Sequence, residues 1–449
     1  MTSGRLKDLS YKHSVPIFEH SPFTAPTIVP PFLKRTATSI KTFSTHKKSM
    51  SNSVSKNLSF NRLGLLLSIA HSTLLKPGQI DITSEINGLI YQLLRHIADE
   101  SNLGYEVASK VGSSKPAKLP LAEFLRSSMH GRIGNGIAGL YARSEGAMYI
   151  AHFEDVQDLA KIQQNHMISV VKQLTGIVTV LSRTPDFITV NRKDEFGIME
   201  AKASGLNKSR SGFLTDPLLK ALREQVDPFV DGEISIGTGF PVKISRGHVC
   251  GIRIGHPAKD TEIHIFEVDS STPPLSSPHT SYLAVLHFNS WVKMLGNAFW
   301  NTDSSLSRLE SIRIGRSNFV LFSINLDSNY IDDQSAWHDI FGIGFLGASV
   351  CNPSGPSYSI LIGIERSILL QLIGIRGEQT LNALPSEELH QSVVSYINES
   401  YENVNSILSI IDSRKENDSG PWKAYFLFLE GVVAFQGLNL TLLRLGIDI

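Results

Sequence analysis

Short runs of β-branched and aromatic residues alternate along the chain with apolar residues at helical spacing. Between Ile86 and Ile97 the apolar positions recur every three or four residues, which predicts one face of a helix. Several runs have the length and composition of strands, at 147–152, 187–190, 196–203, 249–254, 263–268, 319–324 and 358–364. This alternation predicts an α/β (α+β) fold in which helices flank a mixed central sheet.

Longer segments of helical character lie between these runs. They are found at 131–143, 156–178, 216–226, 282–300, 386–410 and 421–446. We interpret the apolar stretch 424–435 as part of a buried C-terminal helix. The pattern predicts four regions: a tail at 1–58, a helical region at 59–130, a core at 131–270 and a mixed α/β region of unknown role at 271–449.

The first 58 residues differ from the rest of the chain in charge and patterning. They hold nine of the 42 basic residues but two of the 42 acidic ones, and they are rich in proline and then in serine and threonine. Such a segment buries little apolar surface, so we predict a disordered tail. The same composition leaves an organellar transit peptide or a nucleic-acid-binding arm as alternatives.

Composition narrows the class and the location of the protein. The apolar share of 41% fits a globular chain with a sizeable core. Two cysteines, Cys250 and Cys351, exclude a disulfide framework and favour a reducing, cytoplasmic location, or an organellar one if 1–58 is a transit peptide. The stretch 424–435 is shorter than the roughly 20 apolar residues that cross a membrane, so we predict no membrane contact.

A polar loop at 191–195 separates two of the predicted strands, which predicts a β-hairpin. If the hairpin is symmetric about Lys193, Asp186 lies opposite Glu200, with Cβ atoms roughly 5 Å apart. Strand alternation places Glu200 and Lys202 on the same face. Two carboxylates and one ammonium group then converge, provided that the register does not slip by one residue.

Two adjacent carboxylates repel each other unless a cation lies between them. Oxygen ligands of this kind suit Mg²⁺ or Mn²⁺, which keep several water ligands. A cation bound by Asp186 and Glu200 could activate water and stabilise a phosphate in its transition state. Lys202 could orient or deprotonate that water, or offset the charge of the phosphate.

Pro185-Asp186 followed by Glu200-Ala201-Lys202 resembles the signature of the PD-(D/E)XK nuclease superfamily, which has the restriction-endonuclease-like fold. The resemblance implies that Asp186 and Glu200 bind the metal and that Lys202 assists the nucleophile. It also implies a core of helix, three-stranded meander, helix and strand, which matches the order of the predicted elements. Gln225 resembles the downstream helix glutamine of the RecB-like branch of the superfamily.

The resemblance thus implies a Mg²⁺- or Mn²⁺-dependent nuclease that hydrolyses phosphodiester bonds of nucleic acid, with DNA as the expected substrate. The implied catalytic residues are Asp186, Glu200, Lys202 and Gln225. Because the net charge is zero, nucleic acid must meet a local basic patch, for which the candidates are Lys208, Arg210, Lys220 and Arg223.

Two departures from the superfamily pattern leave an alternative open. A helical run at 156–178 separates the first two core strands, and the helix at 131–143 lacks a glutamate that many relatives have. Glu145 or Glu154 could replace it. The alternative is an inactive nuclease-fold module that binds nucleic acid, a protein partner or a second copy of the chain, with an exposed Glu–Lys pair on its hairpin.

Two further features are predicted to be structural. The glycines of Gly134-Asn-Gly136-Ile-Ala-Gly139 have the spacing of a dinucleotide-binding loop, but no buried strand precedes them. We therefore predict that they let a helix pack closely. His264 alternates with apolar residues in a predicted strand and is expected to be structural as well.

Overall fold

The chain forms two compact units, described here from a computed structural model. The large-sheet unit comprises residues 13–59 and 101–287, and the small-sheet unit comprises residues 1–12, 60–100 and 288–449. The structure describes residues 12–20, 53–73, 123–156, 170–171, 178–179, 184–205, 213–227, 229–230, 233–234, 242–254, 261–269, 280–295, 311–314, 317–324, 358–377, 387–398, 422–428 and 432–438.

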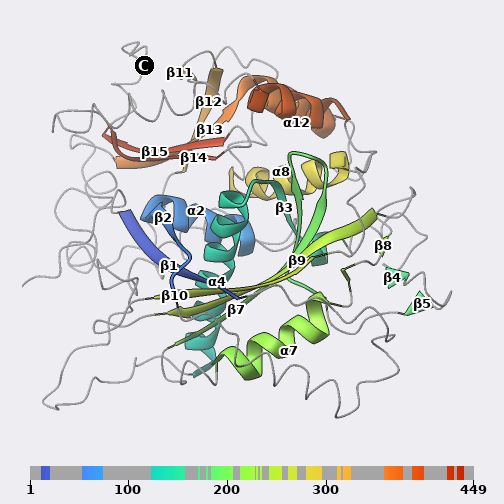
Figure 1. Cartoon of the computed structure of the whole chain (residues 1–449). Coiled ribbons are helices and arrows are strands. Elements are labelled where there is room, and N and C mark those ends of the chain that lie inside the picture. Colours follow the sequence, from blue (N-terminus) through green and yellow to red (C-terminus); the bar gives the residue numbers. More distant parts are fainter. Residues whose placement is uncertain are drawn as a thin grey trace, which may run out of the picture. The chain divides into compact units, whose positions relative to one another are not determined.

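A mixed, strongly curled sheet forms the centre of the large-sheet unit (Figure 1). Its main path runs through β2 (Lys56–Asn61), β1 (Lys12–His20), β10 (Glu262–Asp269), β9 (Val242–Ile254), β7 (Phe196–Gly205), β6 (Phe187–Asn191) and β3 (Ala147–His152). The short strands β4 (Val170–Val171), β5 (Val178–Thr179) and β8 (Glu233–Ile234) branch from β9. The pairs β1–β10 and β7–β9 are parallel, whereas β3–β6, β6–β7 and β9–β10 are antiparallel.

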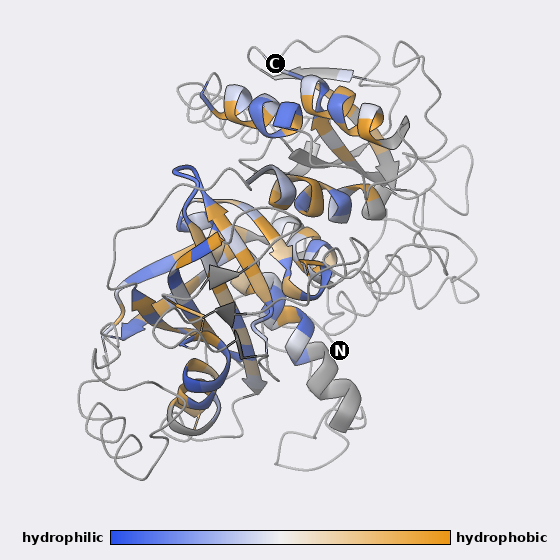
Figure 2. Cartoon of the chain, turned by 90° about the vertical axis from the view of Figure 1, so that its right-hand side faces the viewer, coloured by the Kyte–Doolittle hydropathy of each residue, from blue (hydrophilic) through white to orange (hydrophobic). Residues whose placement is uncertain are grey.

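Helices cover both faces of this sheet (Figure 1). The helix α4 (Glu123–Ser144) lies on one face. On the other face lies a continuous helical segment made of η2 (Leu214–Leu218), α7 (Leu219–Ala221) and η3 (Leu222–Val226), which we call the cover helix. Hydrophobic residues run along the strands and along one side of the cover helix (Figure 2).

Two glycines, Gly134 and Gly251, allow α4 and the cover helix to approach the sheet closely. A Cβ atom at Gly134 of α4 would lie 2.6 Å from the Cβ of Ala203 in β7. A Cβ atom at Gly251 of β9 would lie 2.3 Å from a methyl carbon of Leu218 in the cover helix. The prediction that Gly134 lets a helix pack closely is therefore confirmed.

The small-sheet unit contains a five-stranded antiparallel sheet. Its strand order is β11 (Ser311–Ile314), β12 (Ser317–Ile324), β13 (Tyr358–Glu365), β15 (Val432–Leu438) and β14 (Trp422–Phe428). The helices of this unit are α2 (Arg62–Thr73), α12 (Arg366–Gly377) and a helix at 387–398. The helix α8 (Thr280–Leu295) begins in the large-sheet unit and ends in the small-sheet unit.

The mixed α/β class and most predicted elements are confirmed. The predicted strands correspond to β3, β6, β7, β9, β10, β12 and β13. The predicted helices at 131–143 and 216–226 correspond to α4 and the cover helix, and 282–300 and 386–410 are confirmed at 280–295 and 387–398. The predicted helix between Ile86 and Ile97 and the cysteine Cys351 lie outside the described residues.

The predicted C-terminal helix at 421–446 is wrong, because β14 and β15 form an antiparallel hairpin there. The strand β15 has a partner on each side, β13 and β14. Interior strands read as continuous apolar runs, and such a run does not distinguish a strand from a buried helix by its periodicity.

Two other predictions need correction. Residues 12–20, placed in a disordered tail, form β1, in which Val15 and Ile17 are buried. His13, Val15 and Ile17 alternate with Ser14 and Pro16, which is the pattern of a strand. The prolines of this segment obscure the pattern. The helix predicted at 156–178 is interrupted by β4 and β5, while most of that range and of the tail lies outside the described residues.

Within the part of the chain that the structure describes, no helix is both long enough and apolar enough to cross a membrane.

Candidate functional site

The β6–β7 hairpin has the predicted register. Val190 pairs with Phe196, and Phe187 pairs with Met199. In the turn, the Asn191 side-chain oxygen accepts hydrogen bonds from the backbone N–H groups of Lys193 and Glu195 at 2.9 and 3.1 Å. This Asn-based turn holds the register, and it brings Asp186 opposite Glu200 just beyond the last ladder pair.

Asp186 and Glu200 each bind the backbone of the other strand. Glu200 Oε2 accepts a hydrogen bond from the Asp186 N–H at 3.0 Å. Asp186 Oδ2 accepts one from the Ala201 N–H at 2.9 Å. The carboxylates therefore replace ladder hydrogen bonds where the β6–β7 pairing ends, and both are held in fixed positions.

Lys202 completes the predicted group. Its ammonium forms an ion pair and hydrogen bond with Glu200 Oε1. The Glu200 side chain is fully buried, whereas the Lys202 side chain is 34% exposed. The ammonium thus lies where the buried carboxylate meets solvent, so an incoming group would reach Lys202 before Glu200.

Burial, followed by the neighbouring charge of Asp186, raises the pKa of the Glu200 carboxyl to about 8, and this net shift remains although Lys202 and the hydrogen bond from the Asp186 N–H oppose it. A carboxyl group in this state holds a proton near neutral pH. Titratable groups shifted this far by burial and by a like charge are typical of functional sites, and structural ion-pair networks share the property.

The segment before β6 is held by groups on both sides. Gln225 of the cover helix donates a hydrogen bond from Nε2 to the Thr184 carbonyl at 3.1 Å. The Phe153 N–H, just after β3, donates to the Asp186 carbonyl at 2.9 Å. Gln225 therefore lies beside the other three predicted site residues, and its contact is with the chain that carries Asp186. Phe153 was not predicted, because a backbone donor leaves no signal in residue type.

Neither glutamate suggested as a replacement for the missing helix glutamate joins this group. Glu145 forms an ion pair with Lys56 at 2.5 Å, and Lys56 lies over the Tyr141 ring of α4, on the sheet face opposite the cover helix. Glu154 is exposed. Among the described residues, no cluster of three or more His, Cys, Asp and Glu side chains has the geometry to hold a metal ion.

Two carboxylates on neighbouring strands still fit a divalent cation of the Mg²⁺ type. Mg²⁺ retains several waters and is commonly bound by one or two carboxylates together with substrate phosphates. Asp186 and Glu200 supply that number of hard oxygen ligands at fixed positions. They do not supply the soft or nitrogen ligands that zinc prefers.

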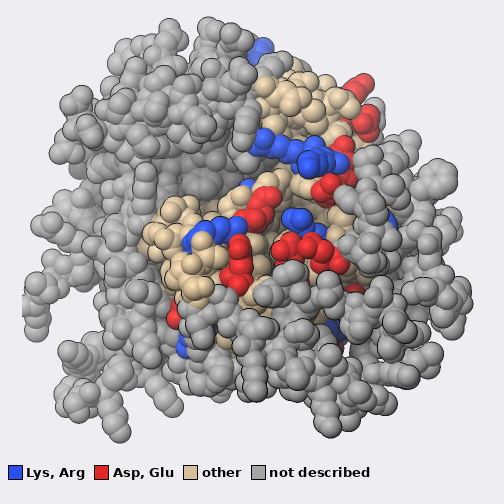
Figure 3. Space-filling model, in the orientation of Figure 1, with Lys and Arg blue, Asp and Glu red and all other residues tan. Residues whose placement is uncertain are grey.

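Charge around the described surface is mixed. Figure 3 shows Lys and Arg side chains next to Asp and Glu across the described part of that face, without a large area of one sign. Of the four residues predicted to form a basic patch, Lys220 is exposed and Arg223 is half-buried, and both lie on the cover helix. Lys208 and Arg210 lie outside the described residues.

In comparisons with protein-family models, with curated proteins and with solved structures, the chain matches none of them.

Proposed function

We propose that the protein is a metal-dependent nuclease that hydrolyses phosphodiester bonds of nucleic acid, with DNA as its substrate. The observation that carries the proposal is the convergence of Asp186, Glu200 and Lys202 at the end of the β6–β7 hairpin. The raised pKa of Glu200 adds support, because groups whose pKa is shifted by burial and by a like charge cluster at functional sites.

The arrangement of the elements also supports this proposal. The chain order is α4, the antiparallel meander β3–β6–β7, the cover helix, and then β9 parallel to β7. The PD-(D/E)XK resemblance implies this order of helix, meander, helix and strand. Asp186 lies one residue before the second strand of the meander, and Glu200 and Lys202 lie on the third. We therefore propose a restriction-endonuclease-like core for the large-sheet unit.

In the proposed reaction, Asp186 and Glu200 would hold Mg²⁺ or Mn²⁺, and the ion would supply positive charge for the phosphate and lower the pKa of water. Glu200 must release its proton to serve as a ligand. Lys202, paired with Glu200 at the solvent boundary, orients the attacking water and offsets negative charge in the transition state. Gln225 is a positioning residue, since it fixes the Thr184 carbonyl and thereby the approach of Asp186.

A second candidate is a catalytically inactive nuclease-fold module that binds nucleic acid or a protein partner. Two observations favour it. Each carboxylate already accepts a backbone hydrogen bond, as expected of a clamp on the hairpin. In addition, no third acidic ligand joins the two carboxylates within the described residues.

The deciding experiment is a cleavage assay on linear duplex DNA, circular duplex DNA, single-stranded DNA and RNA, with Mg²⁺, with Mn²⁺ and with chelator. We expect metal-dependent cleavage by the wild type and a loss of about 10²- to 10⁴-fold in Lys202→Ala, the range for removal of a group that assists proton transfer. Lys193→Ala is the matched control, because Lys193 is exposed in the turn at the far end of the same hairpin.

Metal binding separates the two candidates when no cleavage is seen. Titration calorimetry with Mn²⁺ should show binding to the wild type and none to Asp186→Asn, which keeps a side-chain oxygen for the Ala201 N–H. A wild type that neither cleaves any of the four substrates nor binds Mn²⁺ would refute the nuclease proposal and favour the inactive module.

A further inference from the structure

A second polar chain crosses the large sheet, one strand away from the candidate site. Arg253 of β9 donates from Nη1 to Glu262 Oε2 of β10 at 2.7 Å. The same carboxylate oxygen lies 3.2 Å from His264 Nε2. His264 Nδ1 in turn lies 3.3 Å from His20 Nε2 of β1. This series of polar contacts therefore ends on β1, where His20 lies 244 positions before His264 in the sequence.

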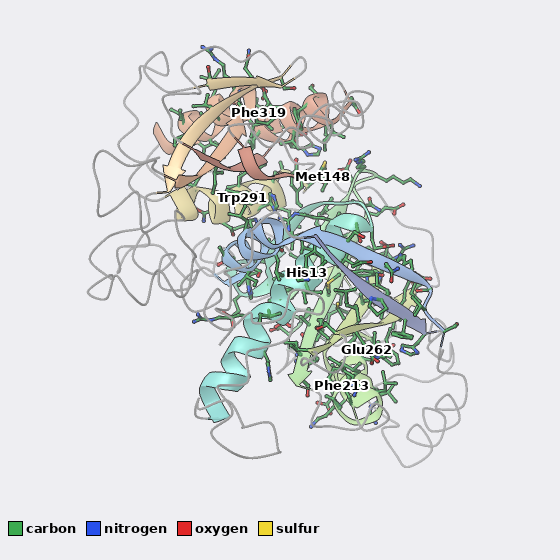
Figure 4. The ribbon with its side chains drawn as sticks, turned by 90° about the vertical axis from the view of Figure 1, so that its left-hand side faces the viewer. His13, Met148, Phe213, Glu262, Trp291 and Phe319 are labelled. Carbon is green, nitrogen blue, oxygen red and sulfur yellow. The ribbon has the colours of Figure 1, made fainter. Side chains whose placement is uncertain are left out.

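The two histidines of this series of contacts, His20 and His264, are buried. His264 is fully buried, and His20 is 4% exposed. The His20 ring stacks on Phe266 with centroids 4.5 Å apart, and His264 contacts Phe18 and Phe213 at 5.1 and 6.3 Å. Figure 4 labels Glu262 of β10 and Phe213, which lies at the start of the cover helix. Aromatic rings therefore border both histidines.

Charged groups near the histidine pair come from β10, β9 and β7. Glu262 of β10 and Arg253 of β9 form an ion pair with each other. The strand register places Lys202 of β7 level with His264, across Gly251 of β9. Because Arg253 and His264 both contact the same oxygen of Glu262, this carboxylate is shared between them.

The hydrogen bond between two imidazole rings needs one donor and one acceptor. With His264 Nε2 donating to Glu262, the contact holds when at least one of the facing nitrogens, His264 Nδ1 or His20 Nε2, carries no proton. If both rings are charged, two N–H donors and two positive charges face each other without solvent. Exposed histidines accept protons near pH 6.5, so acid favours a state in which the rings separate.

We propose that the His20–His264 contact is an acid-sensitive latch that docks β1 against β10. Above pH 7 the latch holds, and between pH 6 and 5 protonation of both rings drives β1 off the sheet. A second contact of β1 is the ion pair at 2.9 Å between Glu19 and Lys56 of β2. The proposal is independent of the nuclease proposal.

Hydrogen exchange of the full chain, read by mass spectrometry of the peptides that cover 12–20, 196–205 and 262–269, tests the latch. Protection factors corrected for intrinsic exchange are compared at pH 7, 6 and 5. We expect protection of 12–20 to fall by at least tenfold from pH 7 to pH 5, which is the effect of about one proton over one pH unit. Protection of 196–205 should change far less.

Two variants identify the groups responsible. His20→Phe keeps an aromatic ring against Phe266 but cannot take a proton, so its 12–20 protection should no longer depend on pH. His20→Gln serves the same purpose if the phenylalanine variant does not fold. His248→Gln is the control, because His248 pairs with Glu267 in the middle of β9, away from His264, and should leave the wild-type pH dependence intact.

Wild-type protection of 12–20 that stays constant from pH 7 to pH 5 would overturn the proposal. The same conclusion follows if the His20 variants lose protection in acid as steeply as the wild type does, since other groups would then be responsible.

Discussion

We predict that the buried carboxyl of Glu200 lowers the free energy of unfolding as the pH rises. Most acidic residues with a partner have the opposite effect. Its pKa is raised from 4.5 to about 8 by burial and by the charge of Asp186. The folded state therefore holds this proton more tightly than the unfolded state does. The stabilisation is complete below pH 4.5 and is lost as the pH rises through about 8.

The size of the effect follows from proton linkage. One proton difference between the folded and unfolded states changes the free energy of unfolding by about 1.4 kcal/mol for each pH unit. Because the difference is less than one proton near both ends of the interval from pH 5 to pH 8, the wild type should lose about 3 kcal/mol from this group there. Glu200→Gln removes the titration and keeps an oxygen that can accept the Asp186 N–H bond. The partly exposed Lys202 can turn toward solvent in this variant.

We therefore expect Glu200→Gln to match the wild type near pH 5 and to be more stable by about 3 kcal/mol near pH 8, without metal. Because the protein has two units, the free energy of unfolding is best read from urea-dependent hydrogen exchange of β6 and β7. Taking the difference between variant and wild type at each pH cancels the titration of all other groups, including the histidine latch.

The reasoning is refuted if this difference does not grow between pH 5 and pH 8. A Glu200→Gln variant that is less stable than the wild type at pH 8 would mean that the ion pair with Lys202 outweighs burial. Glu200 would then be an ordinary ionised carboxylate in a structural salt bridge.

Three other substitutions test an ionisable hydrogen bond and the packing of α4 on β7. Glu267→Gln should destabilise the fold at pH 7 and lose its effect as the pH falls through the lowered pKa of Glu267, whose main cause is the hydrogen bond to His248; urea denaturation over a series of acidic pH values measures this. Gly134→Ala should cost about 1–3 kcal/mol in urea denaturation, since its Cβ would collide with Ala203 across the α4–β7 contact. Gly131→Ala on the same helix meets no described atom within 4 Å, so it should gain up to about 1 kcal/mol of helix propensity and serves as the control.

The sequence could predict those features of the site that depend on neighbouring residues of the β6–β7 hairpin. The register of the hairpin depends on a five-residue turn, and Asn191 closes that turn with its own side chain. Once the register is known, alternation alone places Asp186, Glu200 and Lys202 together. The full burial of Glu200 could not be predicted, because it depends on the packing of elements that are distant from the hairpin in sequence.

The elements that were missed depend on contacts between distant parts of the chain. The strand β1 pairs with β10 some 245 residues later, and its alternating pattern is short and interrupted by Pro16. The hairpin of β14 and β15 is apolar on both faces, and its strand character comes from pairing with β13. Local periodicity contains no information about such partners, so a helix was the expected outcome for the C-terminal run.

The choice between an enzyme and a structural clamp turns on what the carboxylates do beyond binding the hairpin. A clamp needs acceptors for the Asp186 and Ala201 N–H groups, and the neutral side chains of Asn and Gln would provide them without burying charge. The chain instead places two ionisable groups side by side and a lysine at their solvent edge. A divalent cation would remove the repulsion between the carboxylates and release the proton of Glu200. The cost of this arrangement without metal is therefore our main physical argument for a metal-dependent activity.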